Sequence, residues 1–374
     1  VVRGVPDNPL ALIAQENLSQ GYSLCQPNYS FTSRSSVDGE FEYTFTTNQY
    51  GYRGPEFPFE KPAGTIRIMA VGDSYTFGVG AQDDETYSAL LQQSLRQQGY
   101  PVEVINAGVG HASTVRHWDN LLRFHLKYNP DIVVLFFDLT DMGDDWSWER
   151  HAVWNEDGTI NRFDLDYEWG KRRWWPTLVH HSSLCKYLED KVVRTFKKLR
   201  LLGLKRYLKT KASGERAKAV IINSDGEFSD DVMMEYDGLI LMRGQKRKAL
   251  IDKHWKRTEK YLLKIRDLLS ERNIKFMIVM YPHGIYVGPD QWNEGRKTWG
   301  FEQGKQYTDY YPFELMANFT KRAGIPFLNT LPGFLSAPPA RYFFDWDGHM
   351  TPAGNKIVVD QILKDPQFRK LLTR

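Results

Sequence analysis

The sequence is poor in cysteine and has no long hydrophobic run. Its 374 residues include only two cysteines, Cys25 and Cys185, which are too far apart for the paired spacing of zinc or thiol-redox motifs. Two buried thiols are favoured over one disulfide. No stretch approaches the roughly 18 apolar residues of a membrane-spanning helix. The net charge of +3 gives no indication of nucleic acid as a partner.

Aromatic residues, by contrast, are abundant. Trp (11), Tyr (20) and Phe (21) together make up 14% of the chain. That is more ring surface than one core needs, and it suggests an extended surface for sugars or lipids. The chain begins with Val1, Val2 and Arg3 instead of Met. We therefore expect that an upstream signal peptide or anchor has been removed, although a trimmed piece of a longer sequence would begin in the same way.

Short apolar runs alternate with helical patterns in two parts of the chain. Five segments are typical of strands: 66–71, 102–106, 131–137, 275–280 and 326–328. The helical patterns lie at 87–95, 121–125, 260–269 and 313–322, and a last helix follows Thr351 and Pro352. This alternation predicts a doubly wound α/β fold, a parallel sheet of about five strands with helices on both faces. Ligands of such sheets bind at the carboxyl ends of the strands.

Four segments are predicted along the chain. Residues 1–64 form an aromatic, extended N-terminal segment, residues 65–145 and 256–374 form the two parts of the α/β core, and residues 146–255 form a helical insertion or lid. The insertion contains a basic amphipathic stretch within residues 186–211. This stretch is either a solvated helix packed on the core or a surface for an anionic membrane or an anionic polymer.

A serine follows the first predicted strand, in the run Gly72-Asp73-Ser74-Tyr75-Thr76-Phe77-Gly78. A serine at a strand-to-helix turn can project its hydroxyl at the edge of the sheet while its own N–H faces a substrate, as in a nucleophile elbow. Ser74 is therefore the candidate nucleophile. The alternative is that it only caps the following helix.

A histidine precedes the last predicted helix, in the run Asp345-Trp346-Asp347-Gly348-His349. His349 could take the proton of a serine nucleophile, because its loop belongs to the edge of the sheet where ligands bind. Asp347, two residues earlier, could fix the tautomer of the imidazole and stabilise the imidazolium. Asp345 is an alternative for that role.

These motifs together resemble the SGNH (GDSL) hydrolase superfamily. The resemblance is carried by Gly-Asp-Ser-x-Thr-x-Gly after the first strand and by Asp-x-His before the C-terminal helix, and it covers residues 65–145 and 256–374. It implies a flavodoxin-like sheet, with Ser74 as nucleophile, His349 as general base and acid, and Asp347 as its orienting acid.

Two further features connect the sequence with particular branches of the superfamily. The segment Thr47–Gly54 is similar to one that often precedes the serine motif in bacterial extracytoplasmic members. The Asp-x-His spacing differs from the more familiar Asp-x-x-His and is similar to that of polysaccharide O-acetyltransferases and related surface esterases. The resemblance thus implies an extracytoplasmic protein, periplasmic, secreted or anchored.

The resemblance also implies an oxyanion hole with three donors: the N–H of the nucleophile, the N–H of a glycine and an asparagine side chain. In this sequence His111 occupies the glycine position, with Gly110 one place earlier, and Thr140 replaces the asparagine. The implied donors are therefore Ser74, Gly110 or His111, and Thr140. A hydroxyl is less preorganised than an amide, and losing one such donor typically costs about 3 kcal/mol of transition-state stabilisation.

An acidic cluster follows the third strand: Asp138, Asp141, Asp144 and Asp145. Such carboxylates could bind Ca²⁺ or Mg²⁺, but solvation or helix capping is the favoured interpretation. We predict no metal, and the lack of Gly-rich phosphate and zinc motifs gives no indication of a cofactor.

The sequence therefore predicts a serine-dependent ester hydrolase of the SGNH type. Its substrate is expected to be a small-molecule or polysaccharide ester, such as an O-acylated carbohydrate, cleaved through an acyl-enzyme. One alternative is an O-acetyltransferase that modifies a polysaccharide. The other is a catalytically weak or inactive binding or scaffold protein built on the hydrolase frame, with the basic insertion as its working surface.

Overall fold

The computed structural model describes residues 25–37, 39–164, 221–223 and 228–373. Cys185 and the basic stretch within residues 186–211 lie outside these ranges. The interpretations of that stretch therefore stay predictions. Cys25 is a free thiol.

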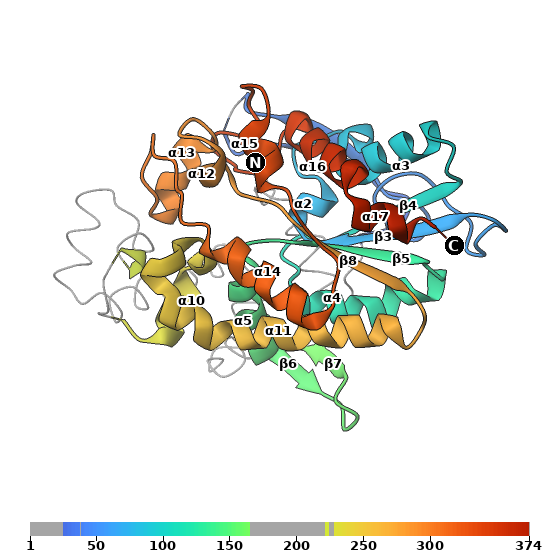
Figure 1. Ribbon diagram of the computed structural model, residues 1–374, viewed down its shortest axis with the longest axis horizontal. Coiled ribbons are helices and arrows are strands. Elements are labelled where there is room, and N and C mark those ends of the chain that lie inside the picture. The colour runs from blue at the N-terminus through green and yellow to red at the C-terminus, as the bar shows by residue number, and fades with distance from the viewer. Residues whose placement is uncertain (1–24, 38, 165–220, 224–227, 374) are drawn as a thin grey trace, which may run out of the picture.

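Five parallel strands form the central sheet, in the order β4-β3-β5-β8-β9 (Figure 1). Their bounds are β3 (Ile66–Gly72), β4 (Val102–Gly108), β5 (Ile132–Phe137), β8 (Lys275–Met280) and β9 (Phe327–Asn329). The first strand of the sheet to appear in the chain lies second in the sheet, which is the flavodoxin-like order. The predicted fold class is confirmed.

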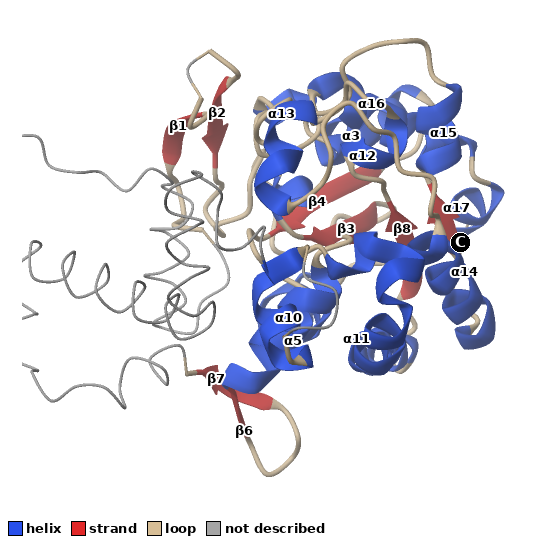
Figure 2. Cartoon of the chain, turned by 90° about the vertical axis from the view of Figure 1, so that its left-hand side faces the viewer, coloured by secondary structure: helices blue, strands red, loops and turns tan. Residues whose placement is uncertain are grey.

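Helices cover both faces of this sheet (Figures 1 and 2). One face carries α3 (Tyr87–Gln97), α16 (Pro352–Lys364) and α17 (Pro366–Leu371). The other face carries α4 (Thr114–Asn120), α5 (Asp141–His151), α11 (Lys248–Ser270) and α14 (Tyr311–Ala323). The chain runs outward from β3 to β4 and then returns past β3 to β5. Because crossover connections are right-handed, this reversal moves the next helices to the opposite face.

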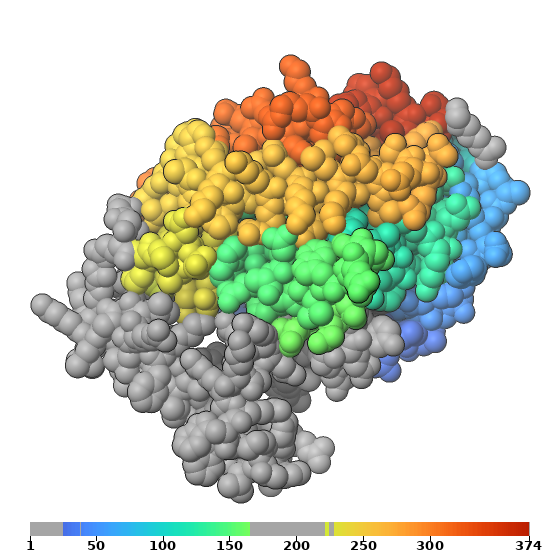
Figure 3. Space-filling model, turned by 90° about the horizontal axis from the view of Figure 1, so that it is seen from below, coloured from blue at the N-terminus to red at the C-terminus, as the bar shows by residue number. Residues whose placement is uncertain are grey.

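Helix α11 is the longest helix among the described residues. It buries a stripe at alternating spacings of three and four residues: Ile251, Trp255, Thr258, Leu262, Ile265 and Leu269. This spacing keeps one face of the helix on the core. Figure 3 shows the solvent side of α11 beside the segment 141–163. The sequence pattern locates only residues 260–269 of this helix, which begins at Lys248, inside the predicted insertion.

Shorter elements surround the core. Two antiparallel hairpins pair β1 (Ser30–Arg34) with β2 (Glu42–Thr46) and β6 (Ala152–Trp154) with β7 (Ile160–Phe163). The short α-helices are α2 (Ser74–Phe77), α10 (Asp230–Tyr236), α12 (Gly284–Val287), α13 (Asn293–Arg296) and α15 (Leu331–Ser336). The β1–β2 hairpin stands outside the central sheet (Figure 2). Because α5 and α11 cross residues 146 and 255, both predicted boundaries of the insertion lie within helices.

Arg53, in the segment that precedes the core, holds the turn after Ser74 in place. Its buried guanidinium donates to the carbonyl oxygens of Phe77 (2.9 Å), Gly78 (2.7 Å) and Ala81 (2.6 Å) and pairs with Asp83 (2.7 Å). The carbonyls of Phe77 and Gly78 lie at the end of α2 and have no partner within so short a helix, and that of Ala81 lies in the turn that follows. The segment Thr47–Gly54 is therefore part of the frame on which the serine turn is built.

Candidate active site

Ser74 is the first residue of α2, directly beyond the end of β3. The cap of this helix is Asp73, whose carboxylate accepts a hydrogen bond from the N–H of Tyr75 at 2.9 Å. The helix can begin this close to the sheet because Gly108 on β4 has no side chain. A Cβ there would lie 2.1 Å from the backbone nitrogen of Phe77. The interpretation of Ser74 as a mere helix cap is therefore wrong, since Asp73 has that role.

Ser74, His349 and Asp347 lie in one chain of hydrogen bonds. Oγ of Ser74 is 2.8 Å from Nε2 of His349, and Nδ1 of His349 is bonded to Oδ1 of Asp347. Between the two loop residues lies Gly348, with φ of 91°, a conformation that glycine adopts without strain. This turn folds the carboxylate back onto the imidazole. The structure thus brings together the three side chains that the sequence selects.

Asp345, the alternative acid, has a different partner. Its Oδ1 accepts hydrogen bonds from the backbone N–H groups of Asn293 (2.8 Å) and Glu294 (3.3 Å). Asp345 therefore holds the start of α13, and Asp347 is the carboxylate that meets His349.

The charges of the pair are mutually stabilised. Burial disfavours the imidazolium of His349, but the carboxylate of Asp347, with weaker contributions from Asp73 and Asp138, holds the pKa of His349 above its ordinary value. Desolvation opposes ionisation of Asp347, yet the imidazole and the N–H of His349 hold the pKa of this carboxyl below its usual range. An imidazole in this setting is a stronger base than a free histidine.

Two residues that the sequence analysis does not select position this loop. The hydroxyl of Tyr75 donates to the carbonyl oxygen of Gly348 at 2.8 Å, and its ring lies 4.6 Å from that of His349. Glu40, in the loop of the β1–β2 hairpin, accepts hydrogen bonds from the N–H groups of Trp346 (2.6 Å) and Asp347 (3.2 Å). Tyr75 could have been suspected from its place beside Ser74. For Glu40 the sequence carries no signal.

A pocket of about 190 Å³ opens at the serine, and two of the predicted oxyanion donors line it with Ser74. His111 has φ of 58°, in the left-handed region that glycine enters freely, and its carbonyl oxygen accepts a hydrogen bond from Trp148 at 2.8 Å. The loop thus has the backbone shape of a glycine at this position. Gly110 is not among the lining residues, so His111 is the better candidate for the second N–H donor.

Thr140, the third predicted donor, also lines the pocket. Its N–H donates to Oδ1 of Asp138 at 2.7 Å, and its hydroxyl lies near the carboxyls of Asp138 and Asp144. These two carboxyls compete with an oxyanion for the one proton of the hydroxyl. Thr140 is therefore less available as a donor than an asparagine amide would be.

The acids of the cluster differ in charge. Burial opposes ionisation of Asp138, but His283 and Thr140 lower its pKa to about 2. Burial and the charge of Asp138 raise the pKa of Asp73 to about 8. Burial, with the charge of Asp138, also raises the pKa of Asp144 well above its usual range. Asp138 is therefore the member of this group most strongly held as a carboxylate, and its charge disfavours ionisation of Asp73 and Asp144.

The cluster does not have the form of a metal site. Asp145 accepts hydrogen bonds from the hydroxyls of Thr114 (2.6 Å) and Thr258 (2.7 Å) and from the N–H of Val115 (3.0 Å), so its oxygens are taken. In the part of the chain that the structure describes, no group of three or more His, Cys, Asp or Glu side chains could hold a metal ion.

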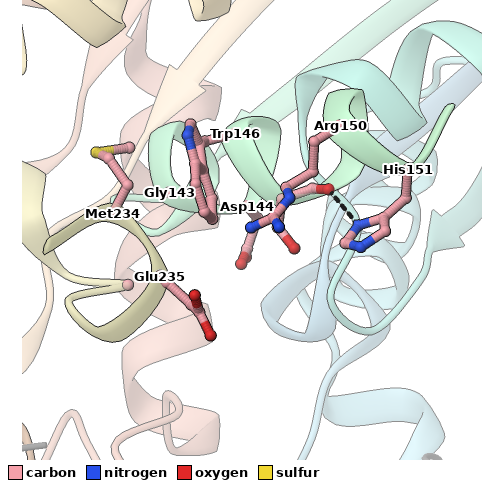
Figure 4. Close-up of a pocket in the computed structure, with 9 residues that line it drawn as sticks. Gly143, Asp144, Trp146, Arg150, His151, Met234 and Glu235 are labelled. Atoms are coloured by element: carbon pink, nitrogen blue, oxygen red, sulfur yellow. Dashed lines mark hydrogen bonds between the residues drawn. The ribbon is translucent and has the colours of Figure 1, made fainter. Parts of the chain in front are cut away.

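A second pocket of about 200 Å³ adjoins the first, between α5 and α10 (Figure 4). Asp144 and Gly238 belong to the walls of both pockets. The guanidinium of Arg150 lies 4.5 Å from the ring centre of Trp146, on the wall formed by α5. The serine pocket therefore continues toward an aromatic and basic wall.

A serine, an imidazole and a carboxylate in hydrogen-bond contact at the carboxyl edge of a doubly wound parallel sheet form the kind of site that α/β ester hydrolases use. Residues 70–234 match the GDSL-like Lipase/Acylhydrolase family. That segment includes Ser74, His111 and Thr140 and ends before the loop of Asp347 and His349. This match supports membership of the SGNH/GDSL hydrolase superfamily and a carboxylic ester hydrolase activity.

Several solved structures resemble the chain. One is an acetyl xylan esterase, AlAXEase (15% identity, TM-score 0.39), which aligns over 80% of this chain and 98% of its own. Another is TesA (12% identity, TM-score 0.38; 82% and 99%). A third is a putative acylhydrolase from Bacteroides fragilis (12% identity, TM-score 0.37; 85% and 93%). Among curated protein sequences, none matches the chain significantly.

None of the helices within the described ranges is both long enough and apolar enough to cross a membrane.

Proposed function

We propose that this protein hydrolyses a carboxylic ester through an acyl-enzyme formed on Ser74. The observation that carries the proposal is the 2.8 Å contact between Oγ of Ser74 and Nε2 of His349, with Nδ1 bonded to Asp347. A nucleophile in hydrogen-bond contact with a base that a third group orients is the arrangement that acyl transfer needs.

The first half of the reaction forms the acyl-enzyme. Oγ of Ser74 attacks the carbonyl carbon while its proton passes to Nε2 of His349, and Asp347 stabilises the imidazolium. The N–H groups of Ser74 and His111 hold the oxyanion, with a smaller contribution from Thr140. When the tetrahedral intermediate collapses, the imidazolium gives its proton to the leaving alcohol and the acyl group stays on Ser74.

The second half releases the acid. Water gives a proton to His349 and attacks the acyl carbonyl; collapse of the second intermediate returns the proton to Oγ of Ser74. If a hydroxyl of a second sugar replaces the water, the same steps transfer the acyl group. Assaying acetate release against acetylation of an added oligosaccharide measures which acceptor is used.

We propose an O-acylated carbohydrate as the substrate class. The pocket wall contains the rings of Trp292 and Trp299 beside carboxyl and imidazole groups, and Trp346 stands 47% exposed next to Asp347. Aromatic faces combined with hydrogen-bonding groups suit a sugar, which has both apolar and hydroxylated sides. The extracytoplasmic location stays a prediction based on the sequence resemblance.

The replacement Ser74→Ala tests the mechanism. We expect kcat on a chromogenic acetyl ester to fall by roughly 10⁴–10⁶-fold, because nucleophile and base act as a unit. The melting temperature should be unchanged, since Ser74 does not cap its helix. A fluorophosphonate should label the unmodified protein stoichiometrically at Ser74 and leave the variant unlabelled. Equal activity of the two proteins would overturn the mechanism, and failure of Ser74 to react would support the non-catalytic alternative.

A further inference from the structure

A second imidazole–carboxylate pair lies in the same pocket as the first. Asp138 follows β5 and His283 follows β8, and these neighbouring strands are paired at Phe137 and Met280. Nε2 of His283 is 2.8 Å from Oδ2 of Asp138, with both side chains buried. Both residues line the pocket that contains Ser74 and His349.

The surroundings of Asp138 determine which nitrogen of His283 carries the proton. Asp138 is held as a carboxylate, because its Oδ1 accepts the N–H of Thr140 and its Oδ2 faces His283. A carboxylate only accepts hydrogen bonds, so Nε2 of His283 must be the protonated nitrogen. In the neutral imidazole the lone pair is therefore on Nδ1.

The second nitrogen, Nδ1, has no hydrogen-bond partner among the described residues. It is also not sealed from solvent, unlike the buried side-chain atoms that lack a partner. Rings pack against the rest of the imidazole, with Tyr75 at 5.2 Å and Trp292 at 6.0 Å between ring centres. Tyr75 also contacts His349, so a single phenol ring touches both imidazoles. In its neutral form His283 thus supplies a hydrogen-bond acceptor of fixed orientation on the wall of the pocket that contains Ser74.

We propose that Nδ1 of His283 accepts a hydrogen bond from a hydroxyl of the ester substrate and so makes the site selective for esters of polyhydroxy compounds over plain alkyl esters. The proposal rests on the function proposed above and names the group that would recognise its substrate. His283 is the specificity-determining residue. Asp138 is a positioning residue, because it acts only by fixing the tautomer and orientation of His283.

Two replacements of His283 separate recognition from a merely structural tie between β5 and β8. In His283→Gln the amide can still reach Asp138, but no acceptor remains at the position of Nδ1. In His283→Asn the carbonyl oxygen lies near the position of Nδ1, while the contact with Asp138 is lost. His254→Gln, on α11 and away from the pocket, is the matched control.

The substrates are matched pairs of esters in which a hydroxyl replaces the terminal methyl group. One pair is 2-hydroxyethyl acetate and propyl acetate, and the other is 3-hydroxypropyl acetate and butyl acetate. For at least one pair we expect the unmodified protein to favour the hydroxyl ester about tenfold in kcat/KM, the usual effect of one hydrogen bond. His283→Gln should remove the preference and change the alkyl ester rate by less than about threefold. His283→Asn should restore part of the preference, and the control should keep it.

A merely structural role of the pair predicts a different result. The kcat/KM values for the hydroxyl ester and the alkyl ester would then fall by the same factor. The fall would be larger in His283→Asn, which loses the contact with Asp138, than in His283→Gln. No preference in the unmodified protein for either pair, or an equal loss on both esters, would overturn the proposal. Two-bond ¹⁵N–¹H spectra of the imidazole provide a second readout, in which Nδ1 should have the shift of an unprotonated nitrogen.

Binding to the Ser74→Ala variant distinguishes failure of this inference from failure of the proposed function. Saturation-transfer NMR compares 2-hydroxyethyl acetate with propyl acetate on this variant, with and without His283→Gln. A preference for the hydroxyl ester that depends on His283 supports the inference even if the unmodified protein fails to cleave either ester. Equal binding of the two esters contradicts it, whatever the activity of Ser74.

Discussion

The imidazole of His349 has one partner on each nitrogen, the hydroxyl of Ser74 and the carboxylate of Asp347. In the proposed mechanism only the neutral imidazole can take the serine proton. Activity should therefore be lost as the pH falls through the pKa of His349, which Asp347 holds above its ordinary value. The midpoint of the acid limb of the pH profile of kcat/KM should therefore give the pKa of His349.

Asp347→Asn should move that limb. Without the carboxylate the imidazolium loses its main stabilising partner, so the pKa of His349 falls and the limb of kcat/KM moves to lower pH. The plateau rate should fall roughly 10³–10⁴-fold, because an amide favours the wrong tautomer. The measurement is kcat/KM on a chromogenic acetyl ester between pH 4 and pH 9. An acid limb that stays in place would show that another group controls it.

His111 carries a different kind of residue-scale cost. A non-glycine residue at φ of 58° is held in a conformation that costs roughly 1–2 kcal/mol. His111→Gly should therefore raise the free energy of unfolding by about 1 kcal/mol, whereas His111→Val should lower it, because a β-branched side chain fits this region poorly. If the N–H of residue 111 holds the oxyanion, His111→Val should also lower kcat at least tenfold. Urea titration gives the free energy of unfolding of both variants, and kcat is measured on the same proteins. Equal free energies of unfolding for His111→Gly and His111→Val would contradict the prediction.

Residues that act through a local motif could be selected from the sequence, whereas those that act through distant contacts could not. Ser74 stands at a strand end, and Asp347 and His349 lie two positions apart. Glu40 and His283 reach the same pocket from a hairpin and from the end of β8. No spacing in the sequence records such contacts, because the fold alone brings these segments together.

Among the larger elements, the β1–β2 hairpin contacts the catalytic loop although it lies outside the central sheet. Its loop residue Glu40 holds the N–H groups of Trp346 and Asp347, and Oε2 of Glu40 also accepts the hydroxyl of Ser35 at 2.9 Å. The hairpin therefore positions the loop that carries the carboxylate and the imidazole.

Glu40→Ala should loosen that loop without altering the core. We expect kcat on a chromogenic acetyl ester to fall by about tenfold to a hundredfold, since small displacements of a catalytic group are costly. The melting temperature should change little. Glu42→Ala, two residues away, removes a carboxylate that pairs with the exposed Arg34; it is the matched control and should retain full activity. Equal kcat values for the two variants would contradict the idea that the hairpin positions the loop of Asp347 and His349.

Whether a helix or strand can be predicted from the sequence depends on which of its residues are buried and whether these are apolar. Strand β5 is buried at every position and therefore gives an apolar run that the sequence analysis recognised. Helix α4 is also buried at all seven positions, Thr114–Asn120, although its residues are mostly polar. It shows no amphipathic stripe, and the sequence pattern predicts helix only at residues 121–125, where the structure has a wider π-helical turn. The sequence pattern does not predict the first half of α11, because charged side chains crowd its buried stripe.

At the scale of the whole molecule, the two edges of the sheet have different tasks. The carboxyl edge carries the pocket and its strained or titrating groups. The amino edge carries Arg67, which is fully buried at the start of β3 and pairs with Glu103 at 2.9 Å. The same guanidinium donates to the carbonyl oxygens of Tyr128 (2.6 Å) and Pro58 (2.8 Å). Stability and catalysis should therefore be separable by mutation.

Arg67→Met tests that separation. It leaves Glu103 and three carbonyl oxygens, those of Pro58, Phe59 and Tyr128, without their buried partner, so the free energy of unfolding should fall by about 3–5 kcal/mol. The kcat/KM of the folded variant, measured at low temperature on a chromogenic acetyl ester, should stay within about twofold, because no group of the pocket has moved. Arg34→Met, which breaks an exposed ion pair with Glu42, is the control and should leave both quantities almost unchanged. A parallel loss of stability and kcat/KM in Arg67→Met would show that the amino edge also shapes the site.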